Sequence, residues 1–454
     1  MLASEGSLNK ASSVNKTFGT IVISYVLLAL LGALLLSLSP MRLKPIPFID
    51  LFFTSVSAVC LTGLITFNPA TDLTIYGQAV IMGLIQAGGF GYMGLAGFLF
   101  LLLGKRMDFK GRMLLKESLD YPNMQGIIRY LKKILLFTLC IEGLGALTLT
   151  LYFLSSMPFK QALWAGIFHA ISAFNNAGFS VFESNLVNYR NDVVVNLTIC
   201  LLIILGGLGF LVLSECYDYR NKSRWSVHTR IVLIATAICI VLGMAVLLLF
   251  EWDNPKSFGE SNWFEKILGV FFISVNLRTA GFNTIDMSGL HDQSLFFSSL
   301  LMVVGAAPGG TAGGIKITTM TLLLVYAYCT LKDKEVVLFQ RTIPQALVKK
   351  SFLVFIITMF YIIISVMILS ATDDTQNKHF LHLLFEICSA FGTVGASTGD
   401  GGTLSFAATF SNFGKLYLAV LMFMGRAGVL MFSMALMGKS KTRHIKYPEE
   451  GVLL

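Results

Sequence analysis

A short sequence stretch built around a glycine recurs four times along this chain of 454 residues. The clearest copy is SAFNNAGF at residues 172–179, and the others are SAVCLTGL at 57–64, VNLRTAGF at 275–282 and SAFGTVGA at 389–396. The shared glycines, Gly63, Gly178, Gly281 and Gly395, are 115, 103 and 114 residues apart. Because self-similarity at a near-constant interval marks an internal repeat, we expect four copies of one structural unit.

The composition indicates a membrane protein. Hydrophobic residues make up 55% of the chain and charged residues only 13%, too few for the surface of a soluble protein of this length. Apolar segments such as residues 18–38, 193–213 and 352–369 approach or reach the roughly 20 residues that cross a bilayer. The first of them continues into a span and does not resemble a cleaved signal peptide. We predict an all-α polytopic membrane protein surrounded by lipid.

Charge and cysteine content argue against two other kinds of site. The net charge of +9 comes from residues in the loops between spans, so it does not indicate a nucleic-acid partner. The seven cysteines are scattered, mostly in apolar segments, and none has CxxC spacing. Neither a disulfide framework nor a metal-cluster site is therefore predicted, and no cofactor is expected in the chain besides the ions it carries.

Each repeat is expected to contain a span, a helix too short to cross the membrane, an extended loop and a second span. The predicted repeats cover residues 18–104, 125–216, 228–329 and 344–437, with short helices at 49–59, 161–174, 263–277 and 379–391. Residues 1–17 and 438–454 are the predicted terminal segments. All four units run in the same sense, which favours an arrangement around a central ion pore, as in potassium channels, over inverted repeats.

Positive charge predicts the orientation. Lys and Arg concentrate in the loops between repeats and in the C-terminal tail, whereas the loops beside the recurring glycines are poorer in them. Both termini are therefore expected in the cytoplasm, with the glycine stretches opening outward from the cell membrane. The outward loops also carry carboxylates, which either form a negative vestibule for cations or are ordinary solvated residues: Glu183, Asp192, Glu251, Asp253, Asp286, Asp373, Asp374 and Asp400.

The glycine stretches suit an ion selectivity filter built from backbone. In potassium-channel filters, carbonyls from four loops replace the hydration shell of the ion, and glycine permits the backbone angles that this requires. One such stretch alone would equally suit a helix C-cap, but four at regular spacing favour a filter without carboxylates. We predict K+ binding at the four glycines, within these filter stretches: Val59, Cys60, Leu61, Thr62 and Gly63; Phe174, Asn175, Asn176, Ala177 and Gly178; Leu277, Arg278, Thr279, Ala280 and Gly281; Phe391, Gly392, Thr393, Val394 and Gly395.

Polar side chains in and beside these stretches are expected to have different roles. Those expected to hold the loops in shape by hydrogen bonds from behind are Thr62, Asn175, Asn176, Thr279 and Thr393. Arg278 would repel K+ on the ion path, so its side chain is expected to point away and to brace the loop through carbonyls or carboxylates. His169 is expected to be a packed polar residue of the second short helix.

A glycine-rich run interrupts the second span of the third repeat. Five glycines and one proline within residues 305–314 are incompatible with a continuous helix. Unpaired backbone cannot face lipid, so this run must lie within protein or line water. We predict a gate loop below the filter, with a static kink as the alternative, formed by Gly305, Ala306, Ala307, Pro308, Gly309, Gly310, Thr311, Ala312, Gly313, Gly314 and, one residue beyond Ile315, Lys316.

Two charged residues lie deep within predicted spans, where charges are rare and usually functional. Arg426 is expected either to donate hydrogen bonds to carbonyls of the gate loop or to form a positive barrier in the pore. Pairing with a carboxylate is the alternative. Glu142 lies in the first span of the second repeat.

With these motifs, the chain resembles the Trk/Ktr/HKT potassium transporters, and most of all the membrane subunit of a bacterial Ktr system. The resemblance extends from about residue 18 to 437. It rests on the four glycine stretches and on IMGLIQAGGFG at 81–91, HAISAFNNAGF at 169–179, RTAGFN at 278–283, GGIK at 313–316 and the pair Gly425-Arg426.

The resemblance implies a K+ filter at the four glycines, a gate at the glycine-rich loop and Arg426 as the partner of that gate. Glycine at position 63, where some sodium-selective plant relatives have serine, favours potassium. The resemblance also implies a homodimer with one pore per protomer, a separate cytoplasmic ring of nucleotide-binding regulatory subunits, and stimulation by Na+. Pro308 is expected to stiffen the loop relative to serine-rich relatives.

Together these features predict potassium uptake, driven by a membrane potential worth about 2.3 kcal/mol per 100 mV for one charge. An obligatorily Na+-coupled K+ symporter is the alternative. An alternating-access carrier for an organic solute would require inverted repeats and a polar midplane pocket. A membrane enzyme is disfavoured because the spans contain neither paired acid–base residues nor a metal cluster.

Overall fold

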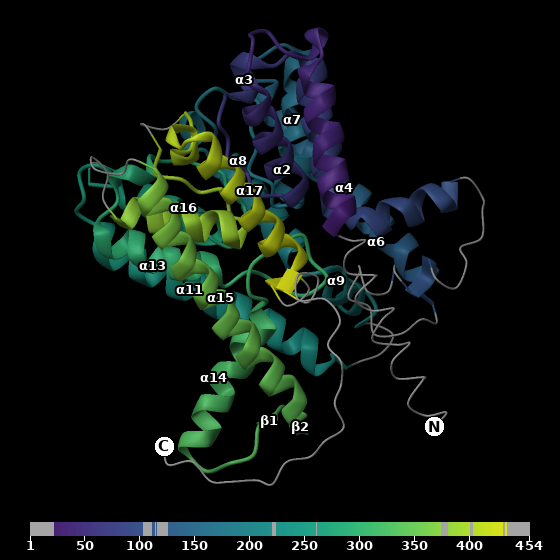
Figure 1. The fold of residues 1–454 in the computed structure, drawn as a ribbon, viewed down its shortest axis with the longest axis vertical. Coiled ribbons are helices and arrows are strands. Elements are labelled where there is room, and N and C mark those ends of the chain that lie inside the picture. Colours follow the sequence, from purple (N-terminus) through teal and green to yellow (C-terminus); the bar gives the residue numbers. More distant parts are fainter. Residues whose placement is uncertain are drawn as a thin grey trace.

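The computed structural model describes residues 22–102, 111–113, 115, 126–219, 224–259, 261–373, 380–399, 403–429 and 432–433. The expectations for residues 1–17 and 438–454, and for Asp374 and Asp400, lie outside this range. The described chain is almost entirely helical (Figure 1). Its short elements are η1 (Ser39–Met41), α3 (Pro69–Asp72), η2 (Val187–Tyr189), η3 (Met287–Gly289), η4 (Phe406–Thr409), β1 (Val337–Leu338) and β2 (Arg341–Thr342).

A helix too short to cross a bilayer lies at each of the four predicted positions. These helices are α2 (Phe48–Cys60), α7 (Phe159–Phe174), α12 (Trp263–Asn276) and α16 (Phe380–Gly392). They occupy the centre of the molecule: ten of the 13 residues of α2 are buried. We call these four the short helices.

Apolar helices, three of them long, lie at the periphery. A helix over Val22–Ser37 and α6 (Ile127–Phe153), α11 (Val227–Glu251) and α15 (Gln345–Thr372) precede the four short helices in turn. Only six of the 28 residues of α15 are buried, so the helix presents apolar side chains outward, as lipid requires. Within the described chain, three helices are long and apolar enough to cross a membrane by themselves, or four if the bent pair α8–α9 counts as one span.

The second helix of each unit is interrupted. The structure has α4 (Ile75–Leu102), α8 (Val193–Gly207) with α9 (Phe210–Tyr217), α13 (Asp292–Val303) with α14 (Ile317–Leu331), and α17 (Asn412–Ala427). Only the interruption between α13 and α14 was predicted. The expectation of continuous spans in the other three units is wrong.

Glycines with positive φ cause the three unpredicted interruptions. Gly91 has φ 67° and ψ 154° inside α4. Gly209 has φ 84° where α8 and α9 meet at 99°. Gly428 has φ 89° at the end of α17. These left-handed values strain any residue with a Cβ, which is why glycine occupies each break.

The helices close into a ring of contacts between units. Each interrupted second helix packs against the short helix of the following unit: α4 against α7, α8 against α12, α13 against α16, and α17 against α2. The last contact joins the end of the chain to its beginning, and Lys415 Nζ lies 2.6 Å from Asp50 Oδ1 across it. Four units therefore surround a common axis.

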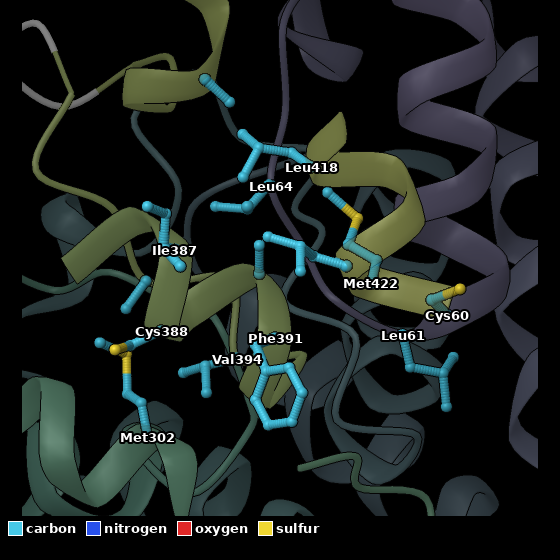
Figure 2. Close-up of a cluster of buried hydrophobic side chains, with 14 of the residues drawn as sticks. Cys60, Leu61, Leu64, Met302, Ile387, Cys388, Phe391, Val394, Leu418 and Met422 are labelled. Carbon is cyan, nitrogen blue, oxygen red and sulfur yellow. The ribbon is translucent and has the colours of Figure 1, made fainter. Parts of the chain in front are cut away.

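A buried apolar cluster surrounds part of this axis. Figure 2 shows Leu61, Phe391 and Val394 among side chains from α2, α13, α16 and α17. All three are fully buried. Because these side chains pack into the core, the chain around them is held rigidly.

Helices α14 and α15 form an arm at the lower end of Figure 1. The β1–β2 hairpin joins them, and the two residues at its tip, Phe339 and Gln340, both have positive φ. Two left-handed residues are what a two-residue type I′ turn requires.

Candidate functional site

The glycines of the four recurring stretches form a closed ring, which we call the glycine ring. A Cβ built on Gly63 would lie 2.6 Å from the carbonyl oxygen of Ala177, the residue before Gly178. The other three glycines face their neighbours in the same way: Gly178 faces the carbonyl of Ala280, Gly281 that of Val394, and Gly395 that of Thr62. The backbones of four segments that are more than 100 residues apart in sequence thus come into van der Waals contact with one another. The ring leaves no room for a side chain at any of the four glycines.

The backbone at the ring has one conformation in all four copies. The ring glycines have φ of 93°, 70°, 79° and 87°. The residues two positions before them are also left-handed, although none is glycine: Leu61 at 60°, Asn176 at 57°, Thr279 at 77° and Thr393 at 51°. A left-handed conformation costs such residues roughly 1–2 kcal/mol each and tends to mark functional sites.

Serine and asparagine side chains brace the ring from behind. Ser57 Oγ accepts a hydrogen bond from Gly63 N at 3.0 Å, and Ser389 Oγ accepts one from Gly395 N at 3.1 Å. In the other two units, Ser172 Oγ donates to the Phe179 carbonyl and Asn276 Oδ1 accepts from Phe282 N. Sequence reasoning missed all four braces. The Ser-Ala pair that opens three of the stretches was the available signal.

The polar side chains predicted as braces have mixed outcomes. Asn176 Nδ2 lies 3.2 Å from Thr279 Oγ1, which joins the second stretch to the third. Thr393 Oγ1 accepts from Gly313 N at 3.0 Å, so it contacts the 305–316 loop. The expectation for Thr62 is wrong, because its buried hydroxyl has no hydrogen-bond partner among the described residues.

Asn175 belongs to a buried polar network with Glu142. Asn175 Nδ2 donates to Glu142 Oε1 and to Gln86 Oε1, both at 2.9 Å. Gln86 Nε2 donates to Glu142 Oε2 at 3.1 Å. Glu142 is thereby satisfied inside the membrane region, and it fixes α4 and the second stretch to α6.

Replacing Glu142 with leucine is expected to destabilise the protein by about 1–3 kcal/mol, because it removes the acceptor of the half-buried Gln86 amide and one of the acceptors of the buried Asn175 amide. The measurement is the thermal unfolding midpoint of the purified protein in detergent. Cys140→Ala is the matched control, since Cys140 lies on the same helix but is exposed. Equal midpoints for the two variants would contradict the structural role of the network.

Three further glycines lie directly beneath the filter stretches. A Cβ on Gly88, Gly206 or Gly425 would collide with the carbonyl oxygen that begins a stretch, those of Val59, Phe174 and Phe391 respectively. Each of these glycines stands three residues before one of the unpredicted breaks. The interrupted helices therefore cross under the ring at backbone contact, which was not predicted.

The 305–316 loop packs against the fourth glycine stretch and against the interrupted helices α8 and α17. Gly313 N donates to Thr393 Oγ1 at 3.0 Å, and Gly314 N donates to the Gly425 carbonyl at 3.2 Å. On the opposite side, Thr311 N donates to the Gly206 carbonyl at 3.4 Å. The loop therefore bridges the second and fourth units under the ring.

The loop is compact as well as anchored. Residues 305–307 and 311–315 are buried, whereas Pro308, Gly309 and Gly310 are half-buried. Gly305 N donates to the Ile315 carbonyl at 2.9 Å, which holds the two ends of the loop together. Lys316 Nζ donates back to the Ala312 carbonyl at 2.7 Å.

Arg426 connects this loop to the first unit. Its Nη1 donates to the Thr311 carbonyl, and its Nη2 donates to the Gly88 carbonyl at 2.5 Å. The expected contact with a loop carbonyl is confirmed. The alternative, a carboxylate partner for Arg426, is wrong for the described residues, because both hydrogen bonds of its guanidinium are donated to backbone carbonyls.

Arg278 points away from the ring, as expected. Its guanidinium donates to the carbonyls of Thr236, on α11, and Gly305, at the start of the loop, both at 3.4 Å. The side chain is buried. The cation thus braces the loop and stays off the axis. His169 is also packed as expected, with Nδ1 2.7 Å from the Ala165 carbonyl.

A cavity, which we call the outer cavity, lies against the glycine ring. All four ring glycines line it, and so do the carboxylate residues Glu183 and Asp286. Three other predicted vestibule residues are engaged in the fold instead: Asp192 accepts from Tyr152, Glu251 is fully buried, and Asp373 accepts from Ser411 N. The predicted negative vestibule is therefore smaller than expected.

The described residues contain no cluster of His, Cys, Asp and Glu that could hold a metal ion. All seven cysteines are free. The oxygen atoms at the ring are backbone carbonyls, which suit a hard monovalent cation rather than a transition metal.

Known proteins are similar to this chain in sequence and in fold. The profile of a family described as TrkH, cation transport protein, matches residues 4–442. Ktr system potassium uptake protein B of Bacillus subtilis is 37% identical over 430 residues, 94% of either protein. Potassium/sodium uptake protein NtpJ of Enterococcus hirae is 34% identical over 411 residues, 90% of either protein. The crystal structure of the potassium transporter TrkH from Vibrio parahaemolyticus has TM-score 0.73 at 18% identity, covering 93% of this chain and 85% of that one.

Proposed function

Because this chain belongs to the TrkH family of cation transport proteins, we propose that it is the membrane subunit of a potassium uptake system, with the glycine ring as its selectivity filter. The observation that carries the proposal is the closed ring of four backbone segments with one shared conformation. The similarity to a Ktr system potassium uptake protein supports potassium as the ion. Family membership makes the chain a transporter rather than an enzyme.

Ion selection follows from the rigidity of the ring. A dehydrated K+ gains carbonyl ligands only if the oxygens stay at the spacing that matches its lost water shell. The side chains of Leu61, Phe391 and Val394 pack into the core, and Ser57 and Ser389 hold the ring amides from behind. This packing resists the contraction that a smaller Na+ would require.

The 305–316 loop acts as the gate in this proposal. It occupies the inner side of the filter, and Arg426 adds a positive charge where an ion would leave. The hydrogen bonds of Gly313, Gly314 and Thr311 to other units measure 3.0–3.4 Å. Each contributes about 0.5–1.5 kcal/mol. Ala307, Gly309 and the Thr311 carbonyl make further hydrogen bonds to α8, α9 and Arg426, so a regulatory signal must offset all of these bonds to displace the loop.

The membrane potential drives uptake, and Na+ stimulates it. One charge gains about 2.3 kcal/mol per 100 mV of inside-negative potential, which suffices without a coupled ion. The similarity to a potassium/sodium uptake protein supports a role for Na+. Obligatory Na+–K+ symport is the alternative.

We further propose that two copies of the chain form a homodimer and bind a separate cytoplasmic ring of nucleotide-binding regulatory subunits. The similarity to a protein of a Ktr system supports a multi-subunit assembly. In the multi-pass arrangement, both termini face the cytoplasm and the glycine ring opens outward.

The experiment is rubidium and potassium uptake in a potassium-uptake-deficient bacterium that expresses this chain, with and without a cognate regulatory subunit and with and without external Na+. We expect saturable uptake that collapses when the membrane potential is removed and that Na+ accelerates. Uptake that stops completely without Na+ would favour the symporter. The absence of rubidium and potassium uptake in every condition would overturn the proposed function.

A further inference from the structure

The outer cavity is lined by the residues two positions after each ring glycine. These residues are Ile65, Ser180, Asn283 and Ser397. Since the ring runs Gly63, Gly178, Gly281, Gly395, the two serines lie across the axis from each other. Three of the four positions therefore carry a side-chain oxygen.

The hydroxyl of each serine donates one hydrogen bond to a buried side chain and accepts one from a backbone N–H. Ser397 Oγ donates to Glu386 Oε2 at 2.7 Å and accepts from Phe406 N at 2.7 Å. Glu386 is fully buried behind it. A serine oxygen has one proton and two lone pairs, so this arrangement leaves one lone pair and no proton for the cavity.

Ser180 repeats the arrangement with histidine in place of glutamate. His169 Nδ1 faces the Ala165 carbonyl, which can only accept, so Nδ1 carries the proton of the neutral ring. Nε2 then accepts from Ser180 Oγ at 2.8 Å, while Phe182 N donates to that oxygen at 3.0 Å. Ser180 also keeps one lone pair and no proton.

The internal repeat indicates that this pairing is not incidental. His169 and Glu386 both stand nine residues before a ring glycine, and their serines stand two after it. In the first unit, Thr54 and Ile65 occupy these positions, and the Thr54 hydroxyl has no partner among the described residues. A histidine or a glutamate occupies the position nine residues before the ring glycine only in the two units that have a serine two residues after it.

Two amide oxygens complete the set of acceptors. The Oδ1 atoms of Asn185 and Asn283 are buried, and the described residues offer neither a hydrogen-bond donor. Both residues line the cavity. An amide oxygen without a hydrogen-bond donor is a suitable ligand for a cation, whereas a site built for an anion would present protons.

We propose that this cavity is a binding site for a partly dehydrated monovalent cation, outward of the glycine ring, in which His169 and Glu386 position the oxygens of Ser180 and Ser397. Glu183 and Asp286 at its edge raise the local cation concentration. The site receives the ion before the carbonyls replace the rest of its water. It rests on the proposed function of the glycine ring.

The test uses the full chain in the rubidium uptake assay, with Ser180→Ala and Ser397→Ala combined. Losing two oxygens that hold the incoming ion is expected to raise KM for Rb+ about three- to tenfold. The maximal rate and the preference for Rb+ over Na+ stay unchanged, because the carbonyls are intact. Ser184→Ala, near Ser180 but not lining the cavity, is the control and keeps the KM of the unmodified protein.

A KM in the double variant equal to that of the control would overturn the proposal, as would a loss of ion preference, which would mean that the serines only shape the filter. If the double variant is not inserted, each single variant is measured for an intermediate KM. Anomalous scattering from Rb+ in the unmodified protein gives a second readout, with a peak expected in the cavity beside one at the ring. A peak at the ring alone would reject the outer site, whereas the absence of both peaks and of uptake would reject the filter itself.

Discussion

Gly178→Ser is expected to reduce the preference for K+ over Na+ by about tenfold or more, which corresponds to about 1.4 kcal/mol of lost discrimination. Gly178 has φ 70°, where a side chain is strained. A Cβ there would lie 2.6 Å from the Ala280 carbonyl oxygen and 2.7 Å from Gly281 Cα. The neighbouring loop must therefore move, and that movement displaces a carbonyl of the ring.

The measurement is inhibition of rubidium uptake by K+ and by Na+ over a range of concentrations. Gly143→Ala is the matched control, because a Cβ at that glycine of α6 would meet nothing within 4 Å. In the control variant, K+ and Na+ should inhibit rubidium uptake at the same concentrations as in the unmodified protein. An inserted Gly178→Ser protein with unchanged competition would show that the ring does not select the ion.

Deleting residues 307–312 is expected to raise ion flux about tenfold or more, provided that the closed state is favoured by at least about 1.4 kcal/mol. The deletion removes the Thr311 carbonyl that holds Arg426 and the Thr311 amide that donates to Gly206. The hydrogen bond between Gly305 N and the Ile315 carbonyl already holds the two ends of the loop together. The shortened loop can therefore close without disturbing α13 or α14.

Ion preference separates a gate from a structural segment in the deletion variant. Since the filter carbonyls are not altered, the variant should keep its preference for K+ over Na+ while its flux rises. The check is the initial rate of rubidium uptake together with the amount of inserted protein. Unchanged or lower flux per inserted molecule would favour a static kink.

The features that could be predicted follow either from a repeated pattern or from local residue chemistry. Four short helices, four left-handed glycines and a break in the third unit follow from spacing and from glycine and proline chemistry. The direction of the Arg278 side chain could also be predicted. A buried guanidinium beside an ion path needs hydrogen-bond acceptors, and backbone carbonyls are almost the only ones within reach. These inferences need only local rules, some applied to every repeat and some to a single one.

The features that were missed depend on contacts between units. Gly88, Gly206 and Gly425 resemble the packing glycines of any membrane helix until the carbonyls beneath the ring are placed against them. The brace of Ser57 to Gly63 and the network of Glu142 likewise require the fold. Conversely, Thr62 was given a bracing role from its residue type alone, and its hydroxyl has no such partner.

The most direct test of the account is potassium flux in proteoliposomes under an imposed inside-negative potential, with no Na+ on either side. The protein is used with its regulatory partner and, separately, as the 307–312 deletion. The account predicts saturable accumulation of K+ and Rb+ that follows the imposed potential, with far slower entry of Na+ when it is offered alone. Equal entry of Na+ and K+, or accumulation that requires a Na+ gradient, would contradict conduction through a potassium-selective ring.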